Sequence, residues 1–127
     1  MATSWALPTG CDPELRDAGV SWDAVRLPAS LGDRVLAELG DTSGAVIRDQ
    51  NVRYFLIQPG DADEWMFPPG AQVRVLSEGS VVVVPPVGCS RETCLCWARP
   101  VVNGRVLTRS RVLYAAMRAV IAEAVAQ

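Results

Sequence analysis

Residues 45–58 read Ala-Val-Ile-Arg-Asp-Gln-Asn-Val-Arg-Tyr-Phe-Leu-Ile-Gln, and the fold class follows from this stretch. It contains two runs rich in β-branched, aromatic and other apolar residues, 45–48 and 53–58, with polar residues between them. Such runs are typical of strands, and Asp49-Gln50-Asn51 predicts the tight loop of a hairpin. The centre of the chain is therefore expected to form an antiparallel pair.

The sequence on the C-terminal side of this hairpin predicts a short helical turn, a second hairpin, a further strand and a turn: residues 62–67, strands 72–76 and 80–84 joined through 77–79, strand 93–99, and Asn103-Gly104. Four consecutive valines at 81–84 cannot alternate with polar residues, so this strand is expected to be covered on both faces. Pro85-Pro86 ends it, because proline cannot donate to a central ladder.

Apolar residues at a spacing of 3.6 predict two helices. Residues 30–39 begin at Ser30, a good N-cap, and stop before Gly40, while 110–126 form a longer helix with one apolar stripe. A strand at 22–27 ends before Pro28. We therefore predict an α+β domain with an antiparallel-rich sheet of about five strands, built from two hairpins and backed by two helices, the longer one C-terminal.

The chain has 127 residues, enough for one domain. Residues 1–20 contain Pro8, Gly10, Pro13 and Gly19 and are expected to be an irregular lead-in to a single domain at 21–127. The longest apolar stretch, residues 81–87, is far shorter than a membrane span, and the N-terminus does not resemble a secretory signal. We expect a cytoplasmic protein without a membrane partner.

All twelve basic residues are arginine and there is no histidine, which excludes His-dependent triads and HExxH zinc sites. The missing lysine is typical of the codon usage of a GC-rich genome, and we expect a bacterial one. Residues 1–64 hold eleven of the fourteen acidic groups, whereas residues 65–127 hold seven of the arginines. This asymmetry indicates either a local footprint for an acidic partner or solvated helix faces.

Four cysteines, Cys11, Cys89, Cys94 and Cys96, raise the question of metal binding. On a strand, Cys94 and Cys96 would share one face, with Leu95 and Trp97 on the other. Four thiolates could hold zinc, but Cys11 stands alone where structural zinc sites favour paired cysteines. The alternatives are a disulfide and, in better agreement with the spacing, unligated buried thiols without a cofactor.

Residues 72–97 run QVRVLSEGSVVVVPPVGCSRETCLCW, with Arg74, Gly79, Pro85-Pro86 and Trp97 in a distinctive order. This stretch resembles the N-terminal domain of the bifunctional DNA primase/polymerase (prim-pol) family, in which a strand turns on glycine into a "GGYVVAPPS" strand. Residues 53–60 are similar to the family's "GxHxYFxxPxG" strand. The resemblance covers about residues 20–100 and implies a central strand at 81–84, with Gly79 as the turn residue.

Residues 22–28 take the place of the strand that carries the family's catalytic Asp-x-Asp pair, but only Asp23 is present. Arg53 stands where the family has a histidine. Two metal ions need clustered carboxylates, so the resemblance implies a truncated, degenerate relative without enzymatic activity. Asp61, Asp63 and Glu64 form another acidic cluster, and near a Pro-Gly turn such residues more often serve a helix N-terminus than a cation.

We therefore expect a non-catalytic interaction or regulatory domain that contacts another protein or itself, with Trp65, Phe67 and Trp97 as interface residues. The alternative is a nucleic-acid- or nucleotide-binding module that contacts phosphates through Arg53, Arg74, Arg91 and Arg99. In that case Arg53 and Arg74 would point to a common face from neighbouring strands. Otherwise each would pair with a surface carboxylate such as Asp49 or Glu78.

Overall fold

The structure is a computed structural model that describes residues 13–68, 70–86, 95–102 and 104–126, with side chains described through Glu123. In chain order its elements are β1 (Glu14–Asp17), β2 (Asp23–Pro28), α1 (Ala29–Leu39), the 3₁₀ turn η1 (Gly40–Thr42), β3 (Val46–Asp49), β4 (Val52–Ile57), β5 (Arg74–Leu76), β6 (Val81–Val84), β7 (Leu95–Arg99) and α2 (Ser110–Ala126).

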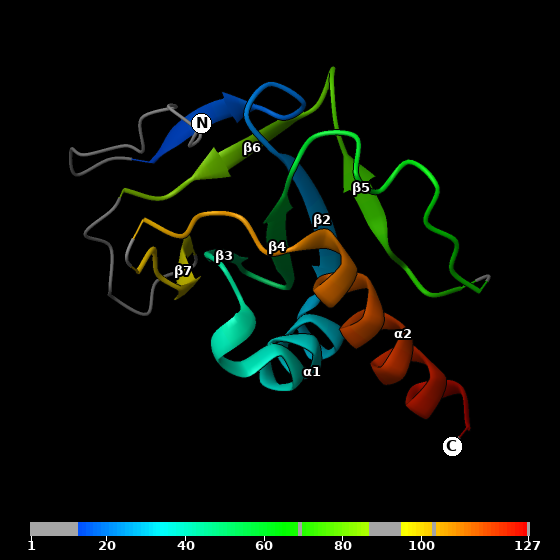
Figure 1. Ribbon diagram of the computed structural model, residues 1–127. Helices are drawn as coiled ribbons and strands as arrows, with labels where there is room; N and C mark the ends of the chain where they lie inside the picture. Colours follow the sequence, from blue (N-terminus) through cyan, green and yellow to red (C-terminus); the bar gives the residue numbers. More distant parts are fainter. Residues whose placement is uncertain (1–12, 69, 87–94, 103, 127) are drawn as a thin grey trace.

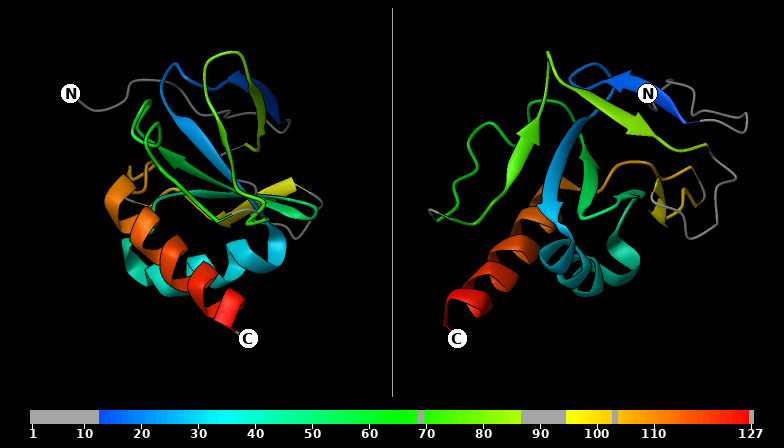
Figure 2. Two further views of the ribbon diagram at one scale, coloured as in Figure 1. Left: turned by 90° about the vertical axis from the view of Figure 1, so that its right-hand side faces the viewer. Right: turned by 180° about the vertical axis from the view of Figure 1, so that it is seen from behind.

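The elements are stacked in three layers (Figures 1 and 2). The middle layer is a five-stranded sheet in the order β5-β2-β4-β3-β7, in which each neighbouring pair is antiparallel. Helices α1 and α2 lie on one face of this sheet, and a two-stranded sheet of β1 and β6 lies on the other. The predicted α+β class, with five antiparallel strands and two helices behind them, is confirmed.

The central hairpin forms where the sequence predicts it. Strands β3 and β4 pair with Asp49 opposite Val52, so that Gln50 and Asn51 are the two loop residues. Gln50 has a φ of 51°, the left-handed conformation that tight hairpin loops require. The pairing places β4 between β2 and β3, in the middle of the sheet.

The predicted second hairpin is wrong. Strand β5 pairs with β2 in the five-stranded sheet, whereas β6 pairs with β1 in the two-stranded sheet. The turn between them does form, with Ser80 N–H bonded to the Ser77 carbonyl and Gly79 at φ 96°, but the chain changes layers there. The partner of β6 is β1, which lies in the part of the chain predicted as an irregular lead-in, so that prediction is wrong for residues 14–17.

The valine strand β6 is an outer strand rather than a central one. Val82 and Val84 face the sheet below and are buried, whereas Val81 is 53% exposed. The expectation that this strand is covered on both faces is therefore wrong. The central position that the prim-pol resemblance implies for residues 81–84 is wrong as well, because nothing in the described residues covers the outward face at Val81.

Helix α1 begins one residue earlier than predicted, and Ser30 is not its cap. The N-cap is Pro28, and the Ala29 N–H donates instead to the carbonyl of Asn51 in the hairpin loop. Gly40 ends the helix, as predicted, at φ 54°. The 3₁₀ turn η1 follows directly, so helical structure extends over residues 29–42; α1 itself has 11 residues and α2 has 17.

Residues 58–73 form a long connection from β4 to β5. Two successive turns, closed by Asp63 N–H to the Gly60 carbonyl and Trp65 N–H to the Ala62 carbonyl, replace the helical turn predicted at 62–67. Connections of this length without regular structure are uncommon in compact domains and often carry function.

Two apolar cores hold the layers together. Between the helices and the sheet, the core is centred on Leu27, Phe55, Ile57, Leu113 and Met117. Between the sheet and the β1–β6 layer, it is centred on Trp22, Ile47, Leu56, Val84 and Trp97. No helix within the described residues is long and apolar enough to cross a membrane.

Candidate interaction surfaces

Arg53 lies inside the molecule rather than on a binding surface. It is 6% exposed, on the helix face of β4, and its Nε donates to Oδ1 of Asp33 on α1 at 2.8 Å. Its Nη1 donates to the carbonyls of Gln50 and Val52. A Cβ on Gly32 would come within 2.6 Å of the Arg53 Cγ, so the glycine makes room for this side chain. Arg53 therefore joins α1 to the hairpin, and its assignment as a phosphate contact is wrong.

Arg74 lies on the opposite face of the sheet, and β2 separates its strand from β4. The prediction that Arg53 and Arg74 share a face fails because directly paired residues point the same way. By that rule Arg74 shares its face with Arg26, its partner on β2, and with Tyr54, the partner of Arg26 on β4. Neither Arg53 nor Arg74 pairs with Asp49 or Glu78 among the described residues.

The row of Arg74, Arg26 and Tyr54 crosses three strands. Burial raises the pKa of the Tyr54 phenol, the Arg26 guanidinium lowers it by a smaller amount, and the Asp49 carboxylate raises it. Two arginines placed directly opposite each other repel, so this row favours an anion.

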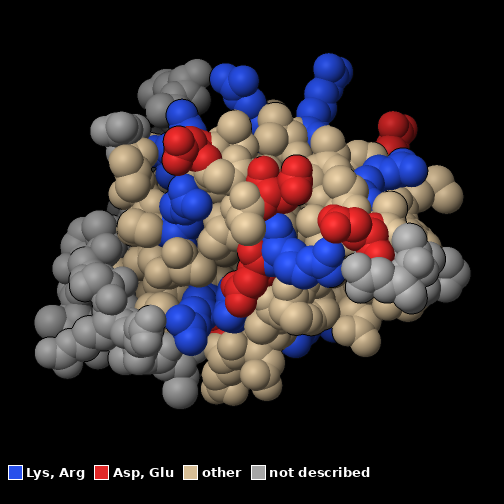
Figure 3. Space-filling view, turned by 90° about the horizontal axis from the view of Figure 1, so that it is seen from below, with Lys and Arg blue, Asp and Glu red and all other residues tan. Residues whose placement is uncertain are grey.

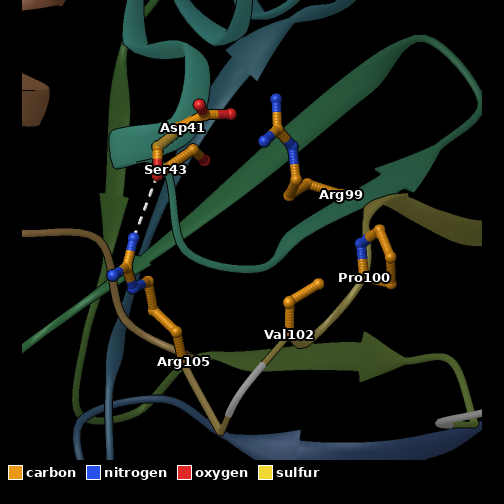
Figure 4. Close-up of a pocket in the computed structure, with 6 residues that line it drawn as sticks. All are labelled: Asp41, Ser43, Arg99, Pro100, Val102 and Arg105. Carbon is orange, nitrogen blue, oxygen red and sulfur yellow. Dashed lines mark hydrogen bonds between the residues drawn. The ribbon is translucent and has the colours of Figure 1, made fainter.

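Arg99 stands at the end of β7 and borders a cavity of about 320 Å³ (Figure 4). The cavity is lined by Asp41, Ser43, Arg99, Pro100, Val102 and Arg105. Of the four arginines predicted to contact phosphate, Arg99 is the one whose position in a cavity fits that role, and Arg91 lies outside the described residues. Arg105 was not among the predicted residues, although the turn signal at Asn103-Gly104 places it next to Val102.

The side chains of Trp65 and Phe67 form an aromatic cluster with Tyr114 on α2. The rings of Trp65 and Tyr114 stack at 4.9 Å between centroids, and Phe67 meets Tyr114 edge-on at 5.5 Å. Arg118 lies 5.6 Å from the centre of the Tyr114 ring. We call Trp65, Met66, Phe67 and Tyr114 the aromatic cluster; the structure thus places two of the three predicted interface residues together at the surface.

Met66 and Tyr114 complete the aromatic cluster, and sequence analysis did not single out either of them. The Met66 N–H donates to the Tyr114 hydroxyl at 3.3 Å, and that hydroxyl donates to the Met66 carbonyl at 3.1 Å. The hydrogen bond from Met66 N–H lowers the pKa of Tyr114, and Arg118 acts in the same direction. The signal that could have revealed Tyr114 is its position off the apolar stripe of its helix.

Trp97, the third predicted interface residue, is in the core. It is 7% exposed, and its Nε1 donates to the carbonyl of Pro86 at 2.9 Å. Its place opposite Ile47 in the ladder puts it under the β1–β6 layer. The prediction failed because an aromatic residue in a short strand has the same pattern whether its face is covered or open.

Cys96 is the one cysteine within the described residues, and it is buried with a free thiol. Cys11, Cys89 and Cys94 lie outside them. Among the described residues, no group of three or more His, Cys, Asp or Glu side chains is placed to hold a metal ion. Cys96 belongs to the helix-facing side of β7 and Trp97 to the other, as the strand alternation predicts.

The acidic residues near the long connection have structural partners. Asp23 is buried, and its Oδ2 accepts the N–H of Gly60 at 2.9 Å. Asp61 accepts a hydrogen bond from the Ser110 hydroxyl at 2.6 Å, at the start of α2. These bonds fix the connection against β2 and α2, which agrees with the structural role expected of the acidic cluster.

The helix side of the molecule carries no area of one charge sign among the described residues. Acidic and basic side chains are interspersed across it (Figure 3), and Arg34 on α1 pairs with Glu123 on α2 at 3.6 Å. A surface that follows a nucleic-acid backbone is instead lined by arginine or lysine. The helix side is therefore a poor candidate for phosphate contacts.

Comparison of the chain with protein-family models, curated proteins and solved structures gave no match.

Proposed function

We propose that this chain is a non-catalytic interaction domain that associates with a second copy of itself through the aromatic cluster. The observation that carries the proposal is Met66, which is 79% exposed although the residues on either side of it belong to an interlocked group of rings. An exposed, unbranched apolar side chain on a fixed aromatic base is typical of a contact surface. The other exposed large apolar residues lie on β1, on β6 and in the segments that follow β1 and β7: Leu15, Val81, Val20 and Val102.

The surface around the aromatic cluster supports a contact between identical copies. Glu64 is exposed directly before Trp65, and Arg118 is exposed beside the Tyr114 ring. In a two-fold contact each copy presents the same patch, so a patch with both signs of charge is complementary to itself. Arg118 of one copy would then face Glu64 of the other.

Met66→Asp is expected to weaken self-association by about tenfold or more, because a carboxylate would be buried without a partner in the contact. The measurement is sedimentation velocity or light scattering over a series of protein concentrations. The wild type is expected to change from monomer to dimer as its concentration rises, and the variant should stay monomeric over that range.

The matched control is Leu15→Asp, which places the same charge on an exposed apolar residue of β1. Leu15 is 70% exposed, and its strand β1 belongs to the two-stranded layer on the face of the sheet opposite α2 (Figure 1). The control should dimerise like the wild type. A wild-type chain that remains monomeric at the highest concentration, or a dimer that Leu15→Asp disrupts and Met66→Asp does not, would contradict the proposal.

A second candidate function is nucleic-acid or nucleotide binding, favoured by the row of Arg74, Arg26 and Tyr54. Two guanidiniums side by side can hold one phosphate, and a partly exposed tyrosine ring next to them can stack on a base. This candidate corresponds to the function that the prim-pol resemblance implies. In this candidate, Arg26 contacts the phosphate in place of Arg53, which the sequence analysis had predicted.

If the second candidate is correct, Arg74→Ala is expected to weaken binding of a single-stranded oligonucleotide at low salt by about tenfold, since a charge-assisted contact to phosphate is lost. Fluorescence anisotropy with a labelled oligonucleotide measures this. Arg109→Ala, a change of the same kind at an exposed arginine of the loop before α2, should leave binding nearly unchanged. Equal losses in both variants would show that the row is not a specific site.

A further inference from the structure

We propose that the cavity between η1 and the turn that follows β7 binds a small oxyanion, the carboxylate or phosphate group of a small molecule. Its volume of about 320 Å³ is at the lower end of the range for small-molecule pockets. The proposal concerns a different part of the molecule from the aromatic cluster and does not depend on self-association.

Two guanidiniums border the cavity from one stretch of chain. Arg99 stands at the end of β7. Arg105 forms an isolated antiparallel bridge with Val102 across the turn that follows. Figure 4 shows both side chains extending toward the segment that carries Asp41 and Ser43. Guanidinium groups are the side chains best shaped to bind carboxylate and phosphate oxygens in pairs.

The positive charge of these two arginines is not neutralised by a close carboxylate within the described residues. The Nη1 of Arg105 donates to the main-chain carbonyl of Asp41 at 3.0 Å, which fixes the side chain but leaves its charge uncompensated. Neither Arg99 nor Arg105 forms an ion pair with a described acidic residue, and Asp41 forms none with them. With two positive charges and one negative, the lining retains a net positive charge that favours an anion.

Hydrogen bonds hold the wall that carries Ser43 against residues 106–108. Ser43 is buried, the Gly44 N–H donates to the Thr108 hydroxyl at 2.9 Å, and the Ala45 N–H donates to the Val106 carbonyl at 3.1 Å. The same wall brings residue 44 against the backbone of Leu107. A cavity with a fixed wall and partly fixed cations binds an anion with a smaller loss of conformational entropy than a mobile surface does.

The negative charge of Asp41 provides a test of the proposal, because it is opposite to the charge of Arg99. Its carboxylate lines the same cavity as the Arg99 guanidinium, and Figure 4 shows the Arg99 side chain extending toward it. A bound oxyanion would be attracted by Arg99 and repelled by Asp41. Removing the two charges should therefore change the affinity in opposite directions, which a merely structural role of these residues does not predict.

The experiment is a nuclear magnetic resonance titration of the isotope-labelled chain with sodium acetate and, separately, with inorganic phosphate at constant ionic strength. Millimolar binding of at least one probe is expected, seen as saturable shifts of the amide signals of Ser43, Val102 and Arg105. Whichever probe binds more tightly identifies the ligand group as carboxylate or phosphate. The amide of Met66 in the aromatic cluster should not shift.

Arg99→Gln is expected to weaken binding of that probe by about tenfold, because one charge-assisted pair of hydrogen bonds is lost. Asp41→Asn should strengthen it by about threefold, the effect of removing one exposed like charge. Arg99→Lys keeps the positive charge but lacks the paired donors of the guanidinium. Its affinity for the probe should lie between those of Arg99→Gln and the wild type, and it serves as the check if the glutamine variant folds poorly. The proposal is overturned if neither probe shifts these amides, or if Asp41→Asn weakens binding as Arg99→Gln does.

Discussion

Trp97→Ala is expected to lower the free energy of unfolding by about 4 kcal/mol, the cost typical of removing a large buried aromatic side chain. Trp97 is 7% exposed in the core between the five-stranded sheet and the β1–β6 layer. Its removal leaves a cavity beneath β6 and takes away the donor that bonds the Pro86 carbonyl. Urea unfolding followed by circular dichroism measures the change.

Trp97→Phe separates the two contributions. Phenylalanine keeps most of the packing but cannot donate to the Pro86 carbonyl, so a loss of about 2 kcal/mol is expected from the unsatisfied acceptor and the smaller ring. Trp65→Ala, in the half-buried aromatic cluster, should cost less than Trp97→Ala. If Trp97→Ala is as stable as the wild type, Trp97 is not the core residue that the fold requires.

Gly44→Ala is expected to destabilise the domain by about 3 kcal/mol, the upper part of the range for overpacked positions. A Cβ at this position would lie 2.5 Å from the carbonyl carbon and oxygen of Leu107 and 2.8 Å from the Val106 oxygen. These are main-chain atoms, so no side-chain rotation relieves the contact. The two segments must separate, which weakens the hydrogen bonds from Gly44 N–H to Thr108 and from Ala45 N–H to Val106.

Gly79→Ala is the control for Gly44→Ala. Gly79 has a φ of 96° and open space where its Cβ would lie, so this substitution tests backbone strain without a steric contact. A loss of about 1 kcal/mol is expected from the left-handed conformation. Thermal or urea unfolding of both variants compares them directly, and a smaller loss for Gly44→Ala than for Gly79→Ala would contradict the close approach of residues 43–45 to 106–108.

Local patterns predicted the elements that neighbouring residues determine. The β3–β4 hairpin follows from two β-rich runs and a short polar loop, and Gly40 ends α1 as its place in the sequence indicates. The apolar stripe of α2 faces the core between the helices and the sheet, as predicted. Its residues Leu113, Ala116, Met117, Val120 and Ile121 are buried, and Val112 is half-buried. These features depend on periodicity and backbone freedom, which the sequence shows directly.

Strand partners could not be predicted in the same way. The valines of β6 identify a strand but not its neighbour, and Glu14-Leu15-Arg16-Asp17 has none of the β-branched residues that would have revealed β1. Arg53 was misplaced for a related reason, because alternation along β4 does not say which face the helices cover. Its position follows only from the packing against Gly32 and the ion pair with Asp33.

The candidate surfaces depend on contacts between distant parts of the chain. Trp65 and Phe67 were predicted as interface residues from their residue type, but Tyr114 joins them only through the folding of the long connection onto α2. Likewise Arg99 was predicted from its charge, whereas Asp41 and Arg105 reach the same cavity from other elements. Residue type therefore indicates candidates, and tertiary packing selects among them.

The most direct test of self-association through the aromatic cluster is an isotope-filtered nuclear Overhauser measurement on a mixture of labelled and unlabelled chains at a concentration at which the dimer forms. The account predicts intermolecular contacts between the Met66 methyl group of one copy and ring protons of Trp65 or Tyr114 of the other. Intermolecular contacts confined to the outer layer, at Leu15 and Val81, would contradict it.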